Sequence, residues 1–149
     1  MATRIPLVIV AGQIEQLQSG DTLAVPSETN STGYSLTNGD VGSTTIGEVV
    51  YISAADTANA AKADAAGTAP AFAIASAVIT SNSAGTYLTS GTITGLTGLT
   101  AGSVYYLSDA LAGAMTTTAP TTVGHYVVRL GVAVSATEFD IDIQAPILL

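Results

Sequence analysis

The chain has 149 residues, and its composition restricts what it can be. It contains no cysteine, which excludes a disulfide scaffold, a cysteine nucleophile and a zinc–thiolate site. Charged residues make up only 9% of the chain, against about 25% in ordinary soluble proteins, and the formal net charge is −8 with only three Lys and Arg. An acidic chain with so few cations argues against direct binding to nucleic acid.

The length predicts a single domain, residues 1–149, and the 48% of hydrophobic residues argues against disorder. We interpret residues 1–25 as an N-terminal arm or hairpin, because the β-rich run "IPLVIV" is followed by a turn signal, "AG", and a second run, "QIEQLQ". No stretch reaches the roughly 18 apolar residues that span a bilayer, and polar residues follow the first apolar run too soon for a signal peptide. We therefore expect no membrane partner.

The middle of the chain alternates between turn-rich and apolar segments. Residues 26–45 are rich in Ser, Thr, Asn and Gly and contain "NGD", a strong turn signal, which predicts a long surface loop or a weak hairpin. The next segment, "GEVVYIS" at residues 47–53, predicts a strand. Residues 54–70 are Ala-rich but show no helical stripe of large apolar groups, so we predict a turn-rich connection with at most one helical turn.

The second half of the chain is dominated by strand patterns. We predict a strand at residues 71–79, a strand, a turn and a strand at residues 85–96, and a strand at residues 102–108. "HYVVRLGVAV" and "EFDIDIQ" predict a closing β-hairpin around "SAT" at residues 135–137. The expected fold class is all-β, as a small barrel or a sandwich with a long Ser/Thr/Gly-rich loop.

Two segments resemble each other. "GEVVYISA" at residues 47–54 and "GSVYYLSD" at residues 102–109 share the pattern G-x-V-x-Y-[Ile/Leu]-S. Alternation places Val49 with Tyr51, and Val104 with Tyr106, on equivalent strand faces. One interpretation is a two-fold internal repeat of a strand–crossover–strand unit. The other is that two strands share common β-formers by chance.

Catalytic residue types are scarce. His125 is the only histidine, it follows a turn glycine, and no nucleophile motif accompanies it, so we expect it to be structural or exposed. The Gly-rich segment "GDVGSTTIG" at residues 39–47 lacks the lysine of a phosphate-binding loop. We predict that the chain is not an enzyme, holds no cofactor and has no metal site.

The last strand pattern carries an acidic strip. In "EFDIDIQ", Glu138, Asp140 and Asp142 alternate with apolar residues, so period two places the three acids on one face. Like charges at this spacing repel, and the strip therefore needs solvent, a cation or a basic partner. Three interpretations stay open: the hydrated face of an edge hairpin, a contact with a basic partner, or a hard-cation site. Arg129 in the preceding strand could lie across the hairpin from it.

Two segments carry a resemblance to a known class. "PLVIVAGQIEQLQSGDTL" at residues 6–23 resembles an opening segment of structural proteins of tailed bacteriophages, and residues 98–149, with "GLTAGSVYYLSD" and a terminal "PILL", resemble a closing segment of the same virion proteins. The resemblance implies a non-enzymatic, oligomeric β-domain on the virion, such as a head decoration (cement) protein. The alternative is a binding module of a head fibre, tail fibre or baseplate.

The decoration interpretation implies a place on the outer capsid surface, with the major capsid protein and further copies of the chain, as a trimer, for partners. Chain ends are usually mobile unless docked, so we expect at least one apolar terminus to be pinned, in an intersubunit sheet or against a capsid protein. Deleting residues 1–10 should then weaken particle binding. The candidate interface comprises Ile5, Pro6, Leu7, Val8, Ile9, Glu138, Asp140, Asp142, Ile147, Leu148 and Leu149.

Overall fold

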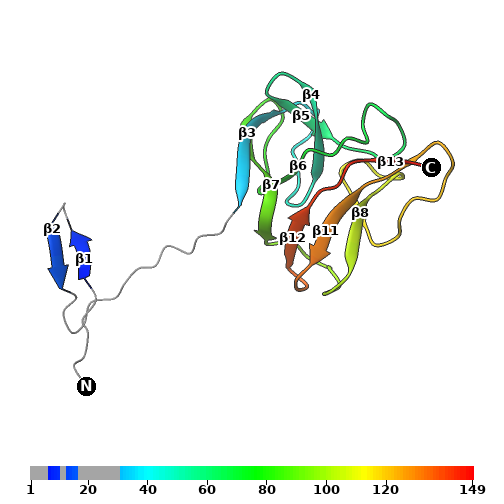
Figure 1. The fold of residues 1–149 in the computed structure, drawn as a ribbon. Coiled ribbons are helices and arrows are strands. Elements are labelled where there is room, and N and C mark those ends of the chain that lie inside the picture. The colour runs from blue at the N-terminus through cyan, green and yellow to red at the C-terminus, as the bar shows by residue number, and fades with distance from the viewer. Residues whose placement is uncertain (1–6, 11–12, 17–30) are drawn as a thin grey trace.

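The computed structural model describes residues 7–10, 13–16 and 31–149, with side chains from residue 31 onward. These residues contain no α-helix, and therefore none long and apolar enough to cross a membrane. The strands are β1 (Leu7–Val10), β2 (Gln13–Gln16), β3 (Thr32–Asn38), β4 (Val49–Ala54), β5 (Thr57–Ala60), β6 (Ala73–Ala75), β7 (Ala84–Thr94), β8 (Val104–Leu107), β9 (Met115–Thr116), β10 (Tyr126–Val127), β11 (Arg129–Ala133), β12 (Glu138–Asp142) and β13 (Ile147–Leu148). The predicted all-β class is confirmed (Figure 1).

The strands form three sheets. β1 pairs with β2, β10 pairs with β13, and the remaining nine strands form one sheet in the order β3-β5-β4-β6-β7-β12-β11-β8-β9. A further pairing of β3 with β7 brings the first strand of this order back against its middle. The nine-stranded sheet as a whole is not a closed barrel, so of the two predicted architectures the sandwich-like one describes it.

The eleven-residue strand β7 connects the two halves of this sheet. Its first half pairs with β3 and β6, and its second half, from Ser90 to Thr94, pairs with β12. The sequence predicted a turn within this segment, and that prediction is wrong. Gly91 has a φ of +90°, which only glycine adopts easily, so the strand bends there and continues, with Gly91 opposite Ile141.

Two segments expected to be loop or connection contain strands. β3 lies within residues 26–45, of which 26–30 are outside the described residues, and β5 lies within the Ala-rich residues 54–70. Only the last three residues of β3 are shielded from solvent, with Leu36 and Asn38 buried, so its pattern does not show the alternation that reveals a strand. β5 reads "TANA", and its only fully buried residue is Ala58, whose small side chain gives no strand signal.

The turn predicted at "NGD" is present and tightly fixed. Asn38 is fully buried, and its amide nitrogen donates to the carbonyl oxygens of Gly42 (2.8 Å) and Ile79 (2.9 Å). Its side-chain oxygen accepts the N–H of Asp40 at 2.9 Å. The buried Thr44 hydroxyl accepts the N–H of Ile79, also at 2.9 Å. Hydrogen bonds from the Asn38 and Thr44 side chains thus satisfy backbone groups of this loop that no strand pairing satisfies.

Two hydrophobic clusters form the core, and β7 contributes to both. The first contains Val49, Ala61, Ala63, Ile74, Ile93, Leu96, Tyr105, Leu107, Val128, Leu130, Ala133, Phe139 and Ile141. The second contains Leu36, Val50, Ala58, Ala73, Ala75, Ile79 and Tyr87. Because Tyr87 and Ile93 lie on the same strand, the backbone of β7 couples the packing of one cluster to the other.

The internal repeat is not confirmed. Both β4 and β8 pair antiparallel with a later strand, but Val49 lies opposite Ile74 and Val104 lies opposite Val132, so the two partners are 25 and 28 residues away and the registers do not coincide. Burial differs too. β8 alternates between half-buried and buried residues, whereas β4 is buried at its start and exposed at its end.

The close pairing of β11 with β12 requires a glycine. Gly131 has a φ of +148°, and a Cβ atom there would overlap the carbonyl oxygen of Asp140 and crowd the ring of Phe139. The contact is with backbone on one side and a fully buried ring on the other, so neither neighbour can move aside easily.

We therefore expect Gly131→Ala to lower the free energy of unfolding by about 3 kcal/mol, through strain and overpacking together. Urea unfolding followed by circular dichroism measures this. Gly102→Ala is the matched control, because Gly102 also has a positive φ (+77°) but no atom lies near its Cβ position, so only the strain of about 1 kcal/mol applies. Equal losses in the two variants would contradict the close approach at Gly131.

A half-buried carboxyl lies at the start of β4. The pKa of Glu48 is raised, chiefly because burial desolvates the carboxylate, and the negative charge of Asp40 adds to the effect. The hydrogen bond that Glu48 accepts from the Thr45 N–H, at 3.1 Å, lowers the pKa and offsets part of this rise. Nearby, the hydroxyl of the fully buried Tyr87 has no hydrogen-bond partner in the described part of the chain, and desolvation followed by the charges of Glu48 and Asp40 raises the pKa of this phenol.

A raised carboxyl pKa means that the folded state favours protonated Glu48. The stability that protonation adds is complete below the unfolded-state pKa of about 4.3 and is lost as pH rises through the higher folded-state value. Glu48→Gln should therefore raise the melting temperature at pH 7 by a few degrees, with the gain vanishing below about pH 4. Thermal melts of both proteins across pH test this, with Glu138→Gln as the control. A Glu48→Gln variant that is less stable than the parent protein at pH 7 would contradict a raised pKa of Glu48.

Candidate binding surface

The acidic strip predicted on the last hairpin is present on β12. Phe139 and Ile141 are buried, whereas Asp140 and Asp142 are exposed and Glu138 is half-buried. The buried side chains belong to the first core cluster, where the ring of Phe139 meets that of Tyr105 edge-on at 5.8 Å. The hydrophobic pattern thus fixes which way the acids point, because a register slip of one residue would expose Phe139.

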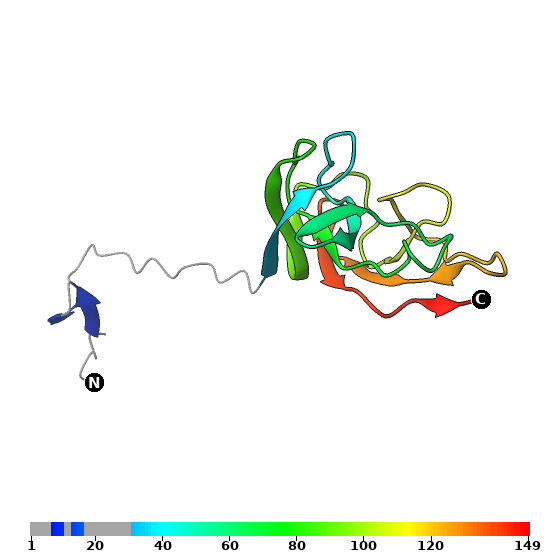
Figure 2. The same ribbon diagram turned by 90° about the horizontal axis from the view of Figure 1, so that it is seen from above.

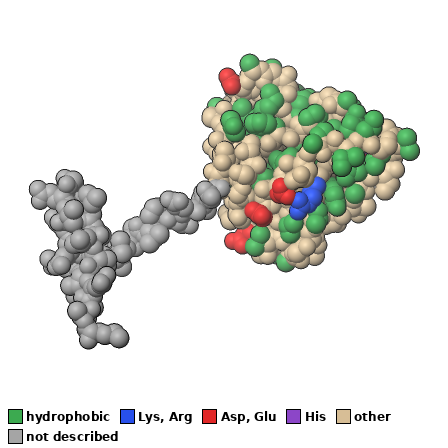
Figure 3. Space-filling view, viewed as in Figure 1, with side chains coloured by type: hydrophobic (Ala, Val, Ile, Leu, Met, Phe, Trp, Pro, Cys, Tyr) green, Lys and Arg blue, Asp and Glu red, His purple; other side chains and the backbone are tan. Residues whose placement is uncertain are grey.

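On the β7 side, the neighbours of the strip are short hydroxyl side chains, whereas on the other side Asp140 lies opposite Val132 of β11. Glu138 lies opposite Thr94, Asp140 opposite Thr92, and Asp142 opposite Ser90 on β7. These β7 residues carry no charge, so they neither repel nor neutralise the acids. Figure 3 shows acidic side chains on this face of the molecule.

Arg129 lies across the hairpin from the strip, as expected. Its guanidinium pairs with the carboxylate of Asp142, and the side-chain amide of Gln144 donates to the other Asp142 oxygen at 2.6 Å. Both partners of the ion pair are substantially exposed, so the pair adds at most about 1 kcal/mol of stability. Asp142 is thus engaged within the chain, while Glu138 and Asp140 form no ion pair with a described residue.

The described residues contain no group of three or more His, Cys, Asp or Glu side chains placed to hold a metal ion. On a flat strand face, successive acids project in parallel and do not converge on one point, as calcium ligands must. This geometry favours the hydrated face or the contact with a basic partner over a hard-cation site.

The C-terminal strand follows β12 and lies at the outside of the domain (Figure 2). β13 pairs antiparallel with β10, with Tyr126 opposite Leu148 and Val127 opposite Ile147. Leu149 donates its N–H to the carbonyl oxygen of His125 at 3.0 Å. The C-terminus is thus held by its own chain, through the backbone, while the side chains of Ile147, Leu148 and Leu149 are exposed.

The N-terminal part of the candidate interface is only partly described. Leu7, Val8 and Ile9 lie in β1, which pairs with β2, whereas Ile5 and Pro6 are outside the described residues.

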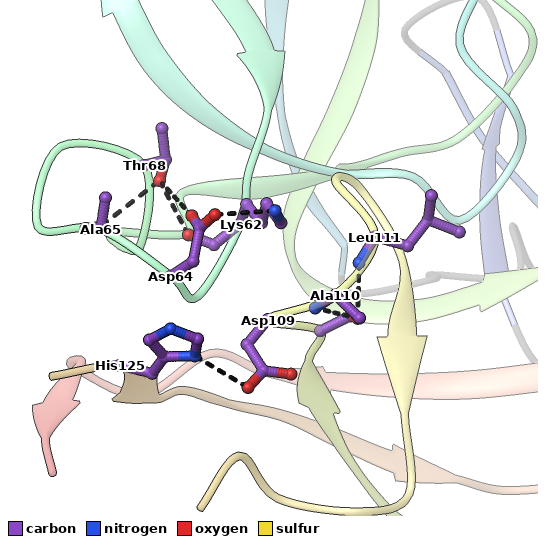
Figure 4. Close-up of polar contacts among 9 residues, drawn as sticks. Lys62, Asp64, Ala65, Thr68, Asp109, Ala110, Leu111 and His125 are labelled. Atoms are coloured by element: carbon purple, nitrogen blue, oxygen red, sulfur yellow. Dashed lines mark hydrogen bonds and ion pairs between the residues drawn. The ribbon is translucent and has the colours of Figure 1, made fainter. Parts of the chain in front are cut away.

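A polar cluster that the sequence did not reveal lies beside β10 (Figure 4). Nδ1 of His125 lies 2.9 Å from a carboxylate oxygen of Asp109, and Nζ of Lys62 lies 2.7 Å from Asp64. The Lys62 ammonium lowers the pKa of Asp64, and the charge of His125 makes a smaller contribution in the same direction. His125 was expected to be structural or exposed, and the structure gives it a partner 16 residues away.

Backbone bonds explain why these side chains meet. Ala63 donates to the carbonyl of Ser108 (3.0 Å), and Tyr126 donates to the carbonyl of Ala63 (2.8 Å), so three distant segments converge on Ala63. The adjacent Ser108 hydroxyl accepts the N–H groups of Ala110 and Leu111, which closes the turn after β8. The His–Asp pair therefore lies at a structural junction of three segments.

A depression beside the strip has no charged side chain in its lining. It has a volume of about 290 Å³ and is lined by hydroxyl and aliphatic side chains, among them Ser31, Leu88 and Thr92. Such a lining offers hydrogen bonds but no general acid or base.

No protein-family model matches the chain, and a search of curated proteins returns no match. The function proposed below therefore rests on this geometry and on the resemblance carried by residues 6–23 and 98–149.

The acidic strip allows a direct test of which face of β12 stabilises the fold. Replacing its three acids together, with Glu138→Gln, Asp140→Asn and Asp142→Asn, should change the free energy of unfolding by less than about 1 kcal/mol, because only one exposed ion pair is lost. Phe139→Ala is the control from the opposite face and should cost about 3–5 kcal/mol. Denaturant unfolding measures both. A triple variant that loses as much as Phe139→Ala would show that the strip is part of the stabilising interactions of the fold.

Proposed function

We propose that this chain is a structural virion protein that binds the outside of a bacteriophage capsid and reinforces it. The support is the resemblance of residues 6–23 and 98–149 to phage virion proteins, together with an all-β domain whose surface is poor in charge. The second candidate is a binding module of a head fibre, tail fibre or baseplate, which the same resemblance favours.

The main support for a place outside the capsid is that both basic side chains of the domain are already paired with acids of the same chain. Residues 31–149 contain ten charged side chains, eight acidic and two basic. Both basic ones are engaged in ion pairs within the chain, Lys62 with Asp64 and Arg129 with Asp142. The domain therefore presents no basic patch to packaged DNA, and its net negative charge is repelled by phosphate. A place outside the capsid carries no such penalty.

A charge-poor surface also suits permanent contact. Burying Thr, Ser, Ala and Gly costs far less desolvation energy than burying ionised groups. Both hydrophobic clusters and two of the three sheets lie within residues 31–149, so apolar packing and strand pairing stabilise the domain.

Reinforcement follows from multivalent contact. A capsid must withstand the pressure of its DNA, and a protein that touches neighbouring capsid subunits makes its second contact at a high effective concentration after the first. A closed oligomer extends this effect, and a trimer would match the threefold positions of a capsid. In this account the partners are the major capsid protein and further copies of the chain.

The proposal requires no catalysis. Only one histidine is present, and in the structure it pairs with Asp109 at a junction of three backbone segments. The fibre or baseplate alternative would use the same domain as a recognition module, and it differs most clearly in how many copies a particle carries.

Counting copies in purified virions tests the proposal and separates it from the alternative. We expect quantitative mass spectrometry to find this chain at an abundance comparable with that of the major capsid protein. Particles made without it should release DNA at a lower temperature, and adding the purified chain should restore DNA retention. The matched control is the addition of an unrelated acidic β-protein. A copy number near that of tail components, or DNA retention that does not depend on the chain, would contradict the decoration role.

A further inference from the structure

The C-terminal strand β13 has an edge that pairs with no described strand. β13 pairs with β10 in a sheet of two strands, separate from the nine-stranded sheet. Leu149 donates its N–H to His125, and hydrogen-bonding positions alternate along an antiparallel pair, so the N–H and C=O of Leu148 point away from β10. Such a backbone edge is a template for another strand.

The side chains around this edge are apolar and exposed. The exposed fractions are 65% for Ile147, 60% for Leu148 and 41% for Leu149, and Val123 in the preceding loop is 87% exposed. Neighbouring aliphatic residues with this exposure mark an interaction surface more often than a bare surface.

The chain itself contains a strand suited to this edge. β1 (Leu7–Val10) reads "LVIV" and belongs, with β2, to the other two-stranded sheet. Isolated two-stranded sheets are marginal in water and gain stability when a further strand is added. β1–β2 is such a sheet, whereas β10–β13 is anchored to the domain through Tyr126, whose N–H donates to the carbonyl oxygen of Ala63. Joining β1 to β13 would therefore give β1 a stable partner strand.

Charge favours the same pairing. Residues 1–14 contain Arg4 and no acidic residue, so this segment is basic. The domain that carries β13 has eight acids and two bases, and both bases are already in ion pairs. A basic apolar segment is thus complementary to an acidic domain with an exposed apolar edge.

The position of the two ends favours a pairing between different copies over a return of the arm to its own domain. The start of β3 and the C-terminus lie at opposite sides of the domain in both views (Figures 1 and 2). β3 therefore begins on the side of the domain away from β13, and a segment that paired with its own β13 would have to pass around the domain. We propose that β1 of one copy adds to the open edge of β13 of the next copy, so that the chains associate head to tail.

A head-to-tail contact has a consequence for assembly. It uses two different surfaces on each copy, and such contacts close into a ring when the rotation between copies allows it. The proposal thus gives the expected oligomer a physical basis. It deepens the proposed function by naming a contact between copies, but it is tested on the isolated chain, so its failure and a failure of the capsid role are distinguishable.

The first test blocks the edge. Leu148→Pro removes the outward N–H while leaving the bond from Leu149 to His125 in place, and Leu148→Ala is the matched control that keeps the N–H. Light scattering after size exclusion should show an oligomer for the full chain and for Leu148→Ala, and association at least about 10-fold weaker for Leu148→Pro. Unchanged melting temperatures confirm folding. A full chain that is monomeric, or an oligomer that survives both Leu148→Pro and deletion of residues 1–16, would overturn the proposal.

The second test identifies which chains are joined, and it uses the absence of cysteine from the sequence. One chain carries Val8→Cys and a second chain, of different length because of a tag, carries Leu148→Cys. A short bismaleimide cross-linker should join the two chains when they are mixed. In the control, Leu148→Cys is mixed with Val78→Cys, which places the second thiol on an exposed loop residue, and no cross-linked pair of chains should form. Cross-linking confined to single chains carrying both Val8→Cys and Leu148→Cys would show that the arm returns to its own domain and would contradict exchange between copies.

Discussion

Backbone hydrogen bonding along β7 joins the two halves of this domain. Its first half holds β3 and β6 around the cluster that contains Tyr87, and its second half holds β12 against the cluster that contains Ile93 and Phe139. Gly91 allows the strand to bend between the two without ending. The orientation of the acidic strip, and through it the course of the C-terminal segment, depends on this pairing.

The sequence predicted the class of fold because long strands with strong alternation dominate it. The hairpin of β11 and β12 around residues 135–137 and the outward direction of its acids followed from period two alone, and both are confirmed. β3 and β5 were missed because they bury only Leu36, Asn38 and Ala58, which do not form a periodic apolar pattern. The turn expected within β7 was wrong because glycine permits a bend as readily as a turn.

The candidate surface was predictable where it lies on one strand and not where it depends on tertiary contact. Arg129 was expected opposite the strip because both belong to one hairpin, and the ion pair with Asp142 confirms it. The pairing of His125 with Asp109 arises because both segments bond to the backbone around residues 62–64, and no spacing in the sequence records such a convergence. Likewise, the exposure of Ile147 and Leu148 could not be deduced from their apolar character, which is equally typical of a buried strand.

The central proposal is that this domain binds a capsid, and the segment from β12 to the C-terminus holds six of the candidate interface residues. Hydrogen–deuterium exchange of the chain, free and bound to purified capsids, measures this directly. The account predicts that peptides covering residues 138–149 exchange more slowly when the chain is bound, while those covering the loop at residues 39–46 are unchanged, because the hydrogen bonds of Asn38 and Thr44 already hold that loop. Protection elsewhere in the domain, with none at residues 138–149, would contradict the account.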